Sequence, residues 1–261
     1  MSWVTSQAVA PELAADLVTG WTARVQGQHR LVPDGCVDVL WIDNGTTWVC
    51  GPETAAWTFT LPPGTEAVGV RFQPGRAGEV LGFDTAEVRN TRVRLEDVVG
   101  ARGERIVAEQ LGDAREPAAR LATLQRHARG WLSGAPDRDP AAHAVARLLG
   151  RNITTPVAAL ADAVALSERQ LHRRCVAAFG YGPATLRRIL RLQRFIRLAN
   201  HPAAPTDLAG LATLAGYTDQ PHLSHECRTI AGVSPRELIG RPQPVRSVHD
   251  TAVQDAAALA A

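Results

Sequence analysis

The spacing of apolar residues divides the chain into an extended part and a helical part. Between residues 30 and 72, short apolar runs alternate with turn-forming residues, which predicts strands at 37–42, 46–50, 58–61 and 67–72. Asn44 and Gly45 separate the first two runs. Because this pair favours a two-residue turn, we expect those two strands to form an antiparallel hairpin. Beyond Pro74 the spacing becomes helical, at 95–99, 101–111 and 117–132.

A break in the pattern predicts a boundary between two domains. Residues 133–137 are Ser-Gly-Ala-Pro-Asp, and Asp139 and Pro140 follow, which is the composition of a linker. A chain of 261 residues can bury two ordinary cores. We therefore expect an α+β fold with a β-rich domain ending in helices at 1–133, a linker at 134–140, an all-α domain at 141–246 and a disordered tail at 247–261.

The helical part contains an internal repeat. The first copy has the residues Leu160, Ala161, Leu166, Ser167, Leu171, Cys175, Gly180 and Pro183. The second has Leu211, Ala212, Tyr217, Thr218, Leu223, Cys227, Gly232 and Pro235. The offset is 51 residues for the first four positions and 52 for the rest, so the second copy has one extra residue, which we place in the turn beside Gly216.

Each copy has the pattern of two helices joined by a turn. In the first copy we expect Thr155 to cap a helix whose first residue is Pro156, and Ser167 and Gln170 have the spacing of a capping box that starts the second helix. One face of that second helix is apolar, with Leu171, Cys175 and Ala178. The opposite face carries Glu168, Arg169, His172 and Arg173.

The second copy repeats this arrangement with different outward residues. Asp219 is expected to cap its second helix, on which Leu223, Cys227 and Ile230 face inward. The outward residues are Gln220, Pro221, Ser224, His225 and Arg228. A long helix at 184–200 should join the copies and hold them apart. A two-helix unit with a polar, arginine-bearing face suits the major groove of DNA, so two such units predict a DNA-binding protein with two helix-turn-helix units.

The distribution of charge supports a polyanionic partner for the helical domain. The chain has no lysine, so its 28 basic residues are all arginines, whose planar guanidinium suits phosphate and guanine. Residues 1–140 hold 14 arginines and 18 acids, a net charge of −4, whereas residues 141–246 hold 14 arginines and 6 acids, a net charge of +8. The composition of the gene alone could explain the lack of lysine. It does not explain the asymmetry.

The second copy resembles a known family through Gly216, Tyr217, Asp219, Gln220, His222, Leu223, Arg228 and the run Gly-Val-Ser-Pro at 232–235. These residues are similar to the signature of the AraC/XylS family of bacterial transcription regulators, and the likeness extends over 151–241. The family implies a monomer that reads two successive major grooves and activates transcription through RNA polymerase. It also implies an N-terminal domain that binds a small effector or forms a homodimer.

The resemblance also assigns roles to residues. It places Arg169 and Arg173 at bases or phosphates in the first unit, and Gln220, Pro221, Ser224 and His225 in the second. We add the outward residues Glu168, His172 and Arg228 as DNA-binding candidates, and Ser167, Arg187, Arg188 and Arg191 as candidates for contact with the DNA backbone.

Two positions depart from the family. His225 stands where arginine is common, so we expect the first unit to contribute more of the affinity. Cys175 and Cys227 stand where the family has a large aromatic residue. We interpret them as smaller core residues, compensated by neighbours such as Phe179 and Phe195, rather than as redox groups.

The β-rich part carries a second resemblance. Residues 33–38, residues 69–72 and the pair Pro74 and Gly75 resemble the β-rich sensor-like domain of one branch of the same family, which implies a small cupin-like barrel. Trp41, Trp48 and Trp57 either line its cavity as an effector site or fill its core. His29, Cys36 and Cys50 lack the spacing of metal ligands, so we expect neither a metal nor another cofactor.

Other classes of protein find little support. No nucleophilic triad, paired carboxylates or phosphate-binding loop is evident, and Cys36 lacks the Pro-Cys-His-Arg setting of a methyl acceptor, so we expect no enzyme. Four scattered cysteines predict reduced thiols, and the lack of a signal peptide or a membrane-length apolar run predicts a cytoplasmic protein that does not contact the membrane. The remaining alternative is an architectural protein that binds double-stranded DNA without specificity.

Overall fold

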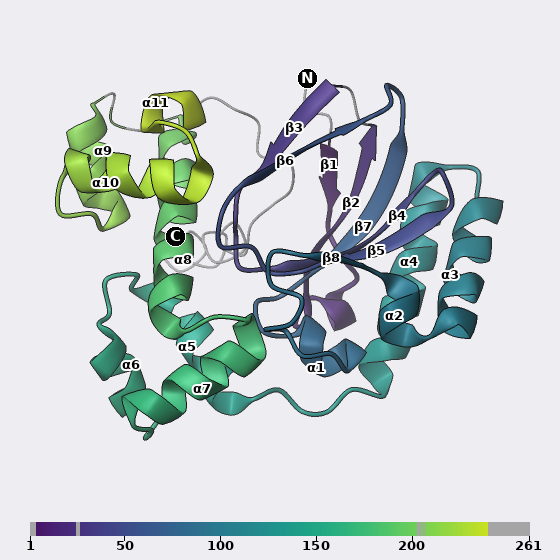
Figure 1. Cartoon of the computed structure of the whole chain (residues 1–261), viewed down its shortest axis with the longest axis horizontal. Helices are drawn as coiled ribbons and strands as arrows, with labels where there is room; N and C mark the ends of the chain where they lie inside the picture. The colour runs from purple at the N-terminus through teal and green to yellow at the C-terminus, as the bar shows by residue number, and fades with distance from the viewer. Residues whose placement is uncertain (1–3, 25–26, 203–204, 206, 240–261) are drawn as a thin grey trace.

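The N-terminal half of the chain folds into two antiparallel sheets. We describe a computed structural model of residues 4–24, 27–202, 205 and 207–239 (Figure 1). The larger sheet has the order β1 (Val4–Gln7), β2 (Leu17–Arg24), β7 (Glu66–Phe72), β4 (Val37–Ile42), β5 (Thr46–Cys50) and β8 (Arg92–Arg94). In the smaller sheet, β3 (Gly27–Leu31) pairs with β6 (Trp57–Leu61). Together with the helical C-terminal half, these sheets confirm the predicted α+β class.

Helices cover one face of the larger sheet. They are the 3₁₀ turn Pro11–Leu13, α1 (Ala77–Leu81), α2 (Leu95–Val99), α3 (Ala101–Asp113) and α4 (Pro117–Ser133). Alternate residues of the strands, including Val39 and Val70, pack under these helices into one core. Figure 1 shows α2–α4 on one side of the sheet and the pair β3–β6 on the other, beside the C-terminal helices.

The predicted hairpin is confirmed. Ile42 pairs with Thr46, so the loop has three residues, Asp43 to Gly45, rather than the expected two. Gly45 N donates to Ile42 O at 2.9 Å, and Gly45 is left-handed with a φ of 83°, as a three-residue hairpin loop favours. Both strands have the predicted bounds, whereas β1, β2, β3 and β8 were not predicted because their apolar residues do not stand out from their neighbours.

The C-terminal half is helical. Its elements are α5 (Pro140–Arg151), α6 (Val157–Ala163), α7 (Glu168–Phe179), α8 (Pro183–Ala199), α9 (Leu208–Ala215), α10 (Gln220–Glu226), a π-helical turn (Cys227–Ala231) and α11 (Pro235–Leu238). Figure 1 places α6 and α7 at one end of α8, and α9 to α11 at the other. The predicted tail at 247–261 lies outside the described residues, among which no helix is long and apolar enough to cross a membrane.

The repeat is visible in the backbone. Leu166 N donates to Ala161 O at 3.0 Å, and at the same step of the second copy Tyr217 N donates to Ala212 O at 2.9 Å. The preceding residue is left-handed in both copies, with a φ of 53° at Ala165 and 92° at Gly216. The two copies stay in register through Leu166 and Tyr217, and the caps Ser167 and Asp219 are then 52 residues apart. This confirms one extra residue in the second turn and places it at Thr218, two residues after Gly216.

One predicted helix start is wrong. Pro156, not Thr155, is the N-cap of α6, and no side chain caps it. The Thr155 hydroxyl instead donates to the carbonyl of Asn152 at 2.8 Å, within the turn that ends α5. Because a threonine hydroxyl can satisfy either a following amide or a preceding carbonyl, the sequence pattern does not distinguish the two.

The left-handed residues of the repeat give a prediction about stability. A non-glycine residue in this conformation costs about 1–2 kcal/mol, and part of that cost returns as glycine loses more chain entropy on folding. We therefore expect Ala165→Gly to raise the free energy of unfolding by about 0.5 kcal/mol. The converse change Gly216→Ala should lower it by more than 1 kcal/mol, since a Cβ there would also lie 3.0 Å from Ile153 Cγ2. Urea unfolding followed by circular dichroism measures both, and equal signs for the two variants would contradict the prediction.

Candidate nucleic-acid interface

The first recognition helix, α7, projects a polar face from a buried one. The capping box that starts it is confirmed: Ser167 Oγ accepts from Gln170 N at 3.3 Å, and Gln170 Oε1 accepts from Ser167 N at 3.0 Å. Leu171 and Cys175 are fully buried. The predicted outward residues Glu168, Arg169, His172 and Arg173 are all exposed.

The second recognition helix is built in the same way. Asp219 caps α10 by accepting from His222 N at 2.7 Å, as predicted. Leu223, Cys227 and Ile230 point into the core. Of the predicted outward residues, Gln220, Pro221, His225 and Arg228 are exposed and Ser224 is half-buried. Contact of either face with DNA stays a prediction.

One outward residue of α7, His172, packs against its own helix-turn-helix unit. A Cβ built on Gly182 would lie 2.5 Å from the imidazole of His172, so the ring rests against the loop that follows the helix. His172 is therefore exposed and at the same time packed against Gly182. The sequence pattern alone places His172 on the outward face but does not reveal this contact.

The predicted backbone-contacting arginines of α8 are engaged within the protein. Arg187 Nη1 donates to Thr155 O at 3.1 Å, and Arg188 Nε donates to Glu226 Oε1 at 2.6 Å. Arg191 Nη2 lies 3.0 Å from Glu226 Oε2, and only 13% of its side chain is exposed. Their contact with phosphates stays a prediction, and for Arg191 it would require these internal contacts to break.

Glu226 is the residue of this interface that the sequence analysis missed. Its side chain is 4% exposed and joins α10 to the connector α8 through two arginines. Around it, the Arg191 guanidinium stacks over the ring of Tyr217 at 4.5 Å and lies 3.3 Å from His222 Nε2. Burial raises the pKa of Tyr217 above its ordinary value, and the nearby Glu226 raises it further.

The equivalent position in the first unit has the opposite charge. Arg174, like Glu226, directly precedes the core cysteine of its recognition helix. Arg174 Nη1 pairs with Asp139 Oδ2 at 2.8 Å, and Asp139 also caps α5. Each recognition helix is thus held by an ion pair at the same step, with the signs reversed. A glutamate or arginine beside a core residue on a polar helix is the signal that could have identified both.

Cys175 and Cys227 occupy the interiors of the two units. Cys175 packs in one core with Phe179, and Cys227 packs in the other with Phe195. Burial raises the pKa of each thiol to about 12, so both stay protonated at neutral pH. These surroundings support the interpretation of both cysteines as small core residues.

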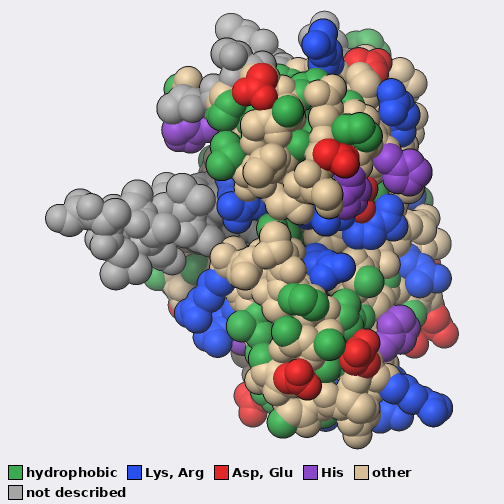
Figure 2. Space-filling model, turned by 90° about the vertical axis from the view of Figure 1, so that its left-hand side faces the viewer, with side chains coloured by type: hydrophobic (Ala, Val, Ile, Leu, Met, Phe, Trp, Pro, Cys, Tyr) green, Lys and Arg blue, Asp and Glu red, His purple; other side chains and the backbone are tan. Residues whose placement is uncertain are grey.

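Arginine and histidine side chains lie along the whole of this side of the molecule. Figure 2 views the side that carries the two helix-turn-helix units, and shows these side chains spread from one unit to the other, with acidic side chains on both units as well. Such a surface suits the regularly spaced phosphates of a duplex.

The three tryptophans of the predicted effector site do not share a surface. Trp41 is 3% exposed and lies on the helix-covered face of the sheet. Trp48 pairs with Leu40 and so lies on the opposite face, where Arg94 stacks over it at 4.9 Å, and Arg92 stacks over Trp57 at 3.5 Å. Trp41 thus fits the alternative in which the tryptophans fill the core, and effector binding by Trp48 and Trp57 stays a prediction.

Two known domain families match the sequence. A helix-turn-helix domain matches residues 160–241, which include both two-helix units. A domain of unknown function matches residues 6–94, which include both sheets. No curated protein matches the chain.

Solved structures of ToxT from Vibrio cholerae are similar to this chain. One has 12% identity and a TM-score of 0.48, over 92% of this chain and 100% of that one. An apo, singly substituted ToxT of strain SCE256 has 10% identity and a TM-score of 0.48, over 85% and 96%. Wild-type ToxT of that strain with a bound unsaturated fatty acid has 12% and 0.44, over 82% and 93%.

The buried ion pairs of Glu226 give a second prediction about stability. Glu226→Gln keeps the size of the side chain but removes the charge that compensates Arg188 and Arg191, so we expect the free energy of unfolding to fall by about 2–3 kcal/mol. Asp162→Asn, at an exposed acid of α6, is the control and should change it by less than about 0.5 kcal/mol. Urea midpoints measure both. Similar effects of the two changes would show that the Glu226 contacts do not stabilise the unit.

Proposed function

Residues 160–241 belong to the AraC-type helix-turn-helix family, and from this premise we propose that α7 and α10 read two successive major grooves of a specific DNA site. A chain with this domain is a DNA-binding transcription regulator, and the family is not one of enzymes.

The observation that supports the proposal most is that the recognition helix is built twice. Each has a side-chain cap at its start, a polar outer face and a buried cysteine, and one helix, α8, joins them. The 17 residues of α8 span about 26 Å. Successive major grooves on one face of a duplex lie about 34 Å apart, a separation that two units at the ends of α8 suit.

The exposed residues suggest how bases are read. Arg169 and Arg173 suit guanine O6 and N7 or the phosphates beside them, and Gln220 suits adenine N6 and N7. In the second unit His225 replaces a permanent charge with a shorter group, so the first unit supplies more of the affinity. Ser167 and Arg228 complete the set as contacts at the groove edges.

The N-terminal domain, residues 1–133, is proposed to regulate this binding. We expect it to bind a small effector or to form a homodimer, and we expect the full protein to activate transcription by contacting RNA polymerase, as the family resemblance implies. The aromatic candidates for the effector are Trp48, on the face of the larger sheet that α2–α4 leave uncovered, and Trp57, on β6 of the smaller sheet.

Specific binding can be tested directly. We expect the full-length protein to select one sequence from a random duplex library and to bind it at least 10³-fold more tightly than an unselected duplex of equal length in the same salt. Fluorescence anisotropy at several salt concentrations measures both affinities. If the two affinities are equal throughout, the protein is an architectural DNA-binding protein and the proposal is wrong.

Substitutions on α7 test the groove assignment. Arg169→Ala and Arg173→Ala should each weaken binding to the selected duplex by about 1–3 kcal/mol if the residue contacts a base. The control Arg147→Ala changes an exposed arginine of α5 and should have a smaller effect. Substitutions of Gln220 or His225 should cost less than those on α7. Unchanged affinity for both α7 variants would exclude this helix from the groove.

A further inference from the structure

Two glycines at equivalent positions of the repeat are the points at which the N-terminal domain touches the recognition helices. Gly180 ends α7 and Gly232 ends the π-helical turn after α10. Both are left-handed, with φ values of 77° and 69°. At this step a helix leaves its last carbonyl groups without partners inside the helix, so a donor from elsewhere can bind them.

At the first unit that donor is Arg89, from the loop before β8. Arg89 Nη1 donates to Gly180 O at 3.0 Å. The glycine itself is pressed against the N-terminal domain, because a Cβ at Gly180 would lie 2.8 Å from Thr85 O and 3.0 Å from Pro52 Cγ. The close approach therefore depends on the missing side chain.

At the second unit the donor is Arg30, on β3. Arg30 Nη1 donates to Ala231 O at 2.9 Å, and a Cβ at Gly232 would lie 2.8 Å from the same nitrogen. Ala56 N, beside β6, donates to Ile230 O at 2.6 Å. The N-terminal domain thus contacts the two units in a similar way. Arg89 binds the carbonyl of the left-handed Gly180 itself, and Arg30 binds the carbonyl of the residue before the left-handed Gly232.

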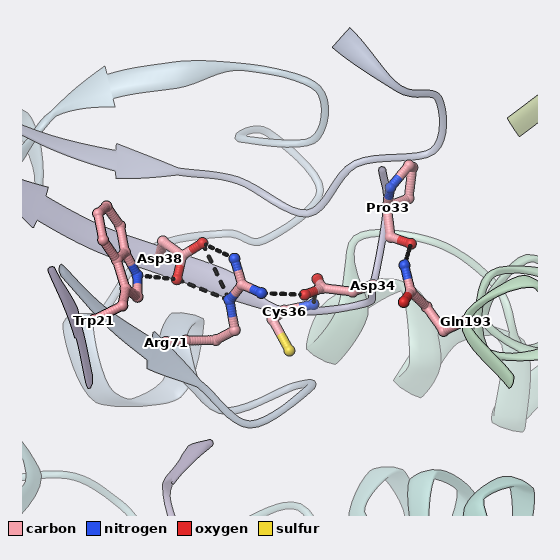
Figure 3. Close-up of polar contacts among 7 residues, drawn as sticks. All are labelled: Trp21, Pro33, Asp34, Cys36, Asp38, Arg71 and Gln193. Atoms are coloured by element: carbon pink, nitrogen blue, oxygen red, sulfur yellow. Dashed lines mark hydrogen bonds and ion pairs between the residues drawn. The ribbon is translucent and has the colours of Figure 1, made fainter. Parts of the chain in front are cut away.

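A third contact fixes the middle of the connector. Gln193 of α8 is buried, and its Nε2 donates to Pro33 O at 2.7 Å (Figure 3). The residues that follow Pro33 are held by Arg71, whose guanidinium contacts Asp34 Oδ2 and Asp38 Oδ2 at 2.6 Å each. The N-terminal domain therefore contacts the first unit through Arg89, the connector through Pro33 and the second unit through Arg30.

Charge strengthens the two outer contacts. The C-terminal end of a helix carries a partial negative charge, so a guanidinium there gains both a hydrogen bond and a favourable field. These contacts restrain the end of each recognition helix opposite to its cap, whereas α8 alone restrains only where each unit is attached. The distance and the rotation between α7 and α10 consequently depend on Arg30 and Arg89.

We propose that Arg30 and Arg89 are positioning residues that determine which spacing between two DNA half-sites the protein accepts. The inference rests on the proposed function, since it requires both recognition helices to enter DNA. One base pair inserted between half-sites moves one groove by about 3.4 Å and rotates it about the duplex axis. A protein whose units are held rigidly discriminates against that change, and one whose units are released does not.

The test compares spacing profiles. The selected duplex is remade with one or two base pairs inserted or removed between its half-sites, and the full-length protein is titrated with each. We expect wild type to lose about tenfold in affinity per base pair of change, and Arg30→Leu/Arg89→Leu to lose less than about threefold. Binding to a duplex with only the half-site of the first unit should be the same for both proteins, because neither arginine belongs to the reading face of α7.

Control variants separate positioning from general loss of structure. Arg24→Leu/Arg105→Leu removes two arginines whose ion pairs, with Glu66 and Glu109, stay within the N-terminal domain, and this variant should keep the wild-type profile. Arg30→Lys/Arg89→Lys keeps a hydrogen-bond donor at each site, so we expect a spacing profile between those of wild type and the leucine variant. If the leucine variant does not fold, the lysine variant takes its place in the test.

The outcomes distinguish the two proposals. A wild-type profile for the leucine pair, or for the lysine pair if only that one folds, would overturn the role of Arg30 and Arg89 while leaving the proposed function intact. If the wild-type protein binds the selected duplex, its respaced versions and an unselected duplex with equal affinity, the proposed function itself is wrong.

Discussion

The arrangement of the two halves of the molecule depends on one buried arginine. Arg71 is 7% exposed and binds Asp34 and Asp38, while Asp38 also accepts from Trp21 Nε1 at 3.3 Å (Figure 3). Burial lowers the pKa of Arg71, but the two carboxylates raise it by more, so the guanidinium stays charged, whereas burial raises the pKa of Asp34. Placing three charged groups inside a protein is favourable only with near-ideal geometry. That geometry fixes the loop that leads into β4, in which Pro33 accepts a hydrogen bond from Gln193 of the connector α8.

Local features of the fold could be predicted from the sequence, and distant ones could not. The hairpin at Asn44 and Gly45 joins residues four positions apart, and the Ser167–Gln170 capping box joins residues three positions apart. At such short separations the residue types strongly favour one local structure. Arg30 and Ala231 are 201 positions apart. Nothing in the sequence around an arginine of a strand indicates which carbonyl group that arginine will bind. Such contacts can therefore be identified only in the folded structure. The prediction that Thr155 caps α6 was wrong for a different reason. The threonine hydroxyl can either cap the following helix or donate to a preceding carbonyl, and here it donates to Asn152 O.

The candidate DNA surface shows the same division. The inward and outward faces of α7 and α10 follow from helical periodicity, and burial agrees with it. The net charge of the segment was a weaker guide. Arg174 is paired with Asp139, and Arg188 and Arg191 are paired with Glu226, so the charge of these arginines is offset within the protein. The charge available to a duplex is therefore smaller than a count over the segment suggests, and its exposed arginines include Arg169 and Arg173 of α7 and Arg147 of α5.

The cysteines at the centres of the two units have a consequence for the chemistry of the cell. Because burial raises the pKa of each thiol to about 12, both are almost entirely protonated at pH 7. Peroxides and electrophiles react with the thiolate, and both sulfur atoms are also shielded from solvent. The hydrophobic centres of the DNA-binding half are thereby inert to oxidative stress, so a signal of that kind would have to enter the protein elsewhere.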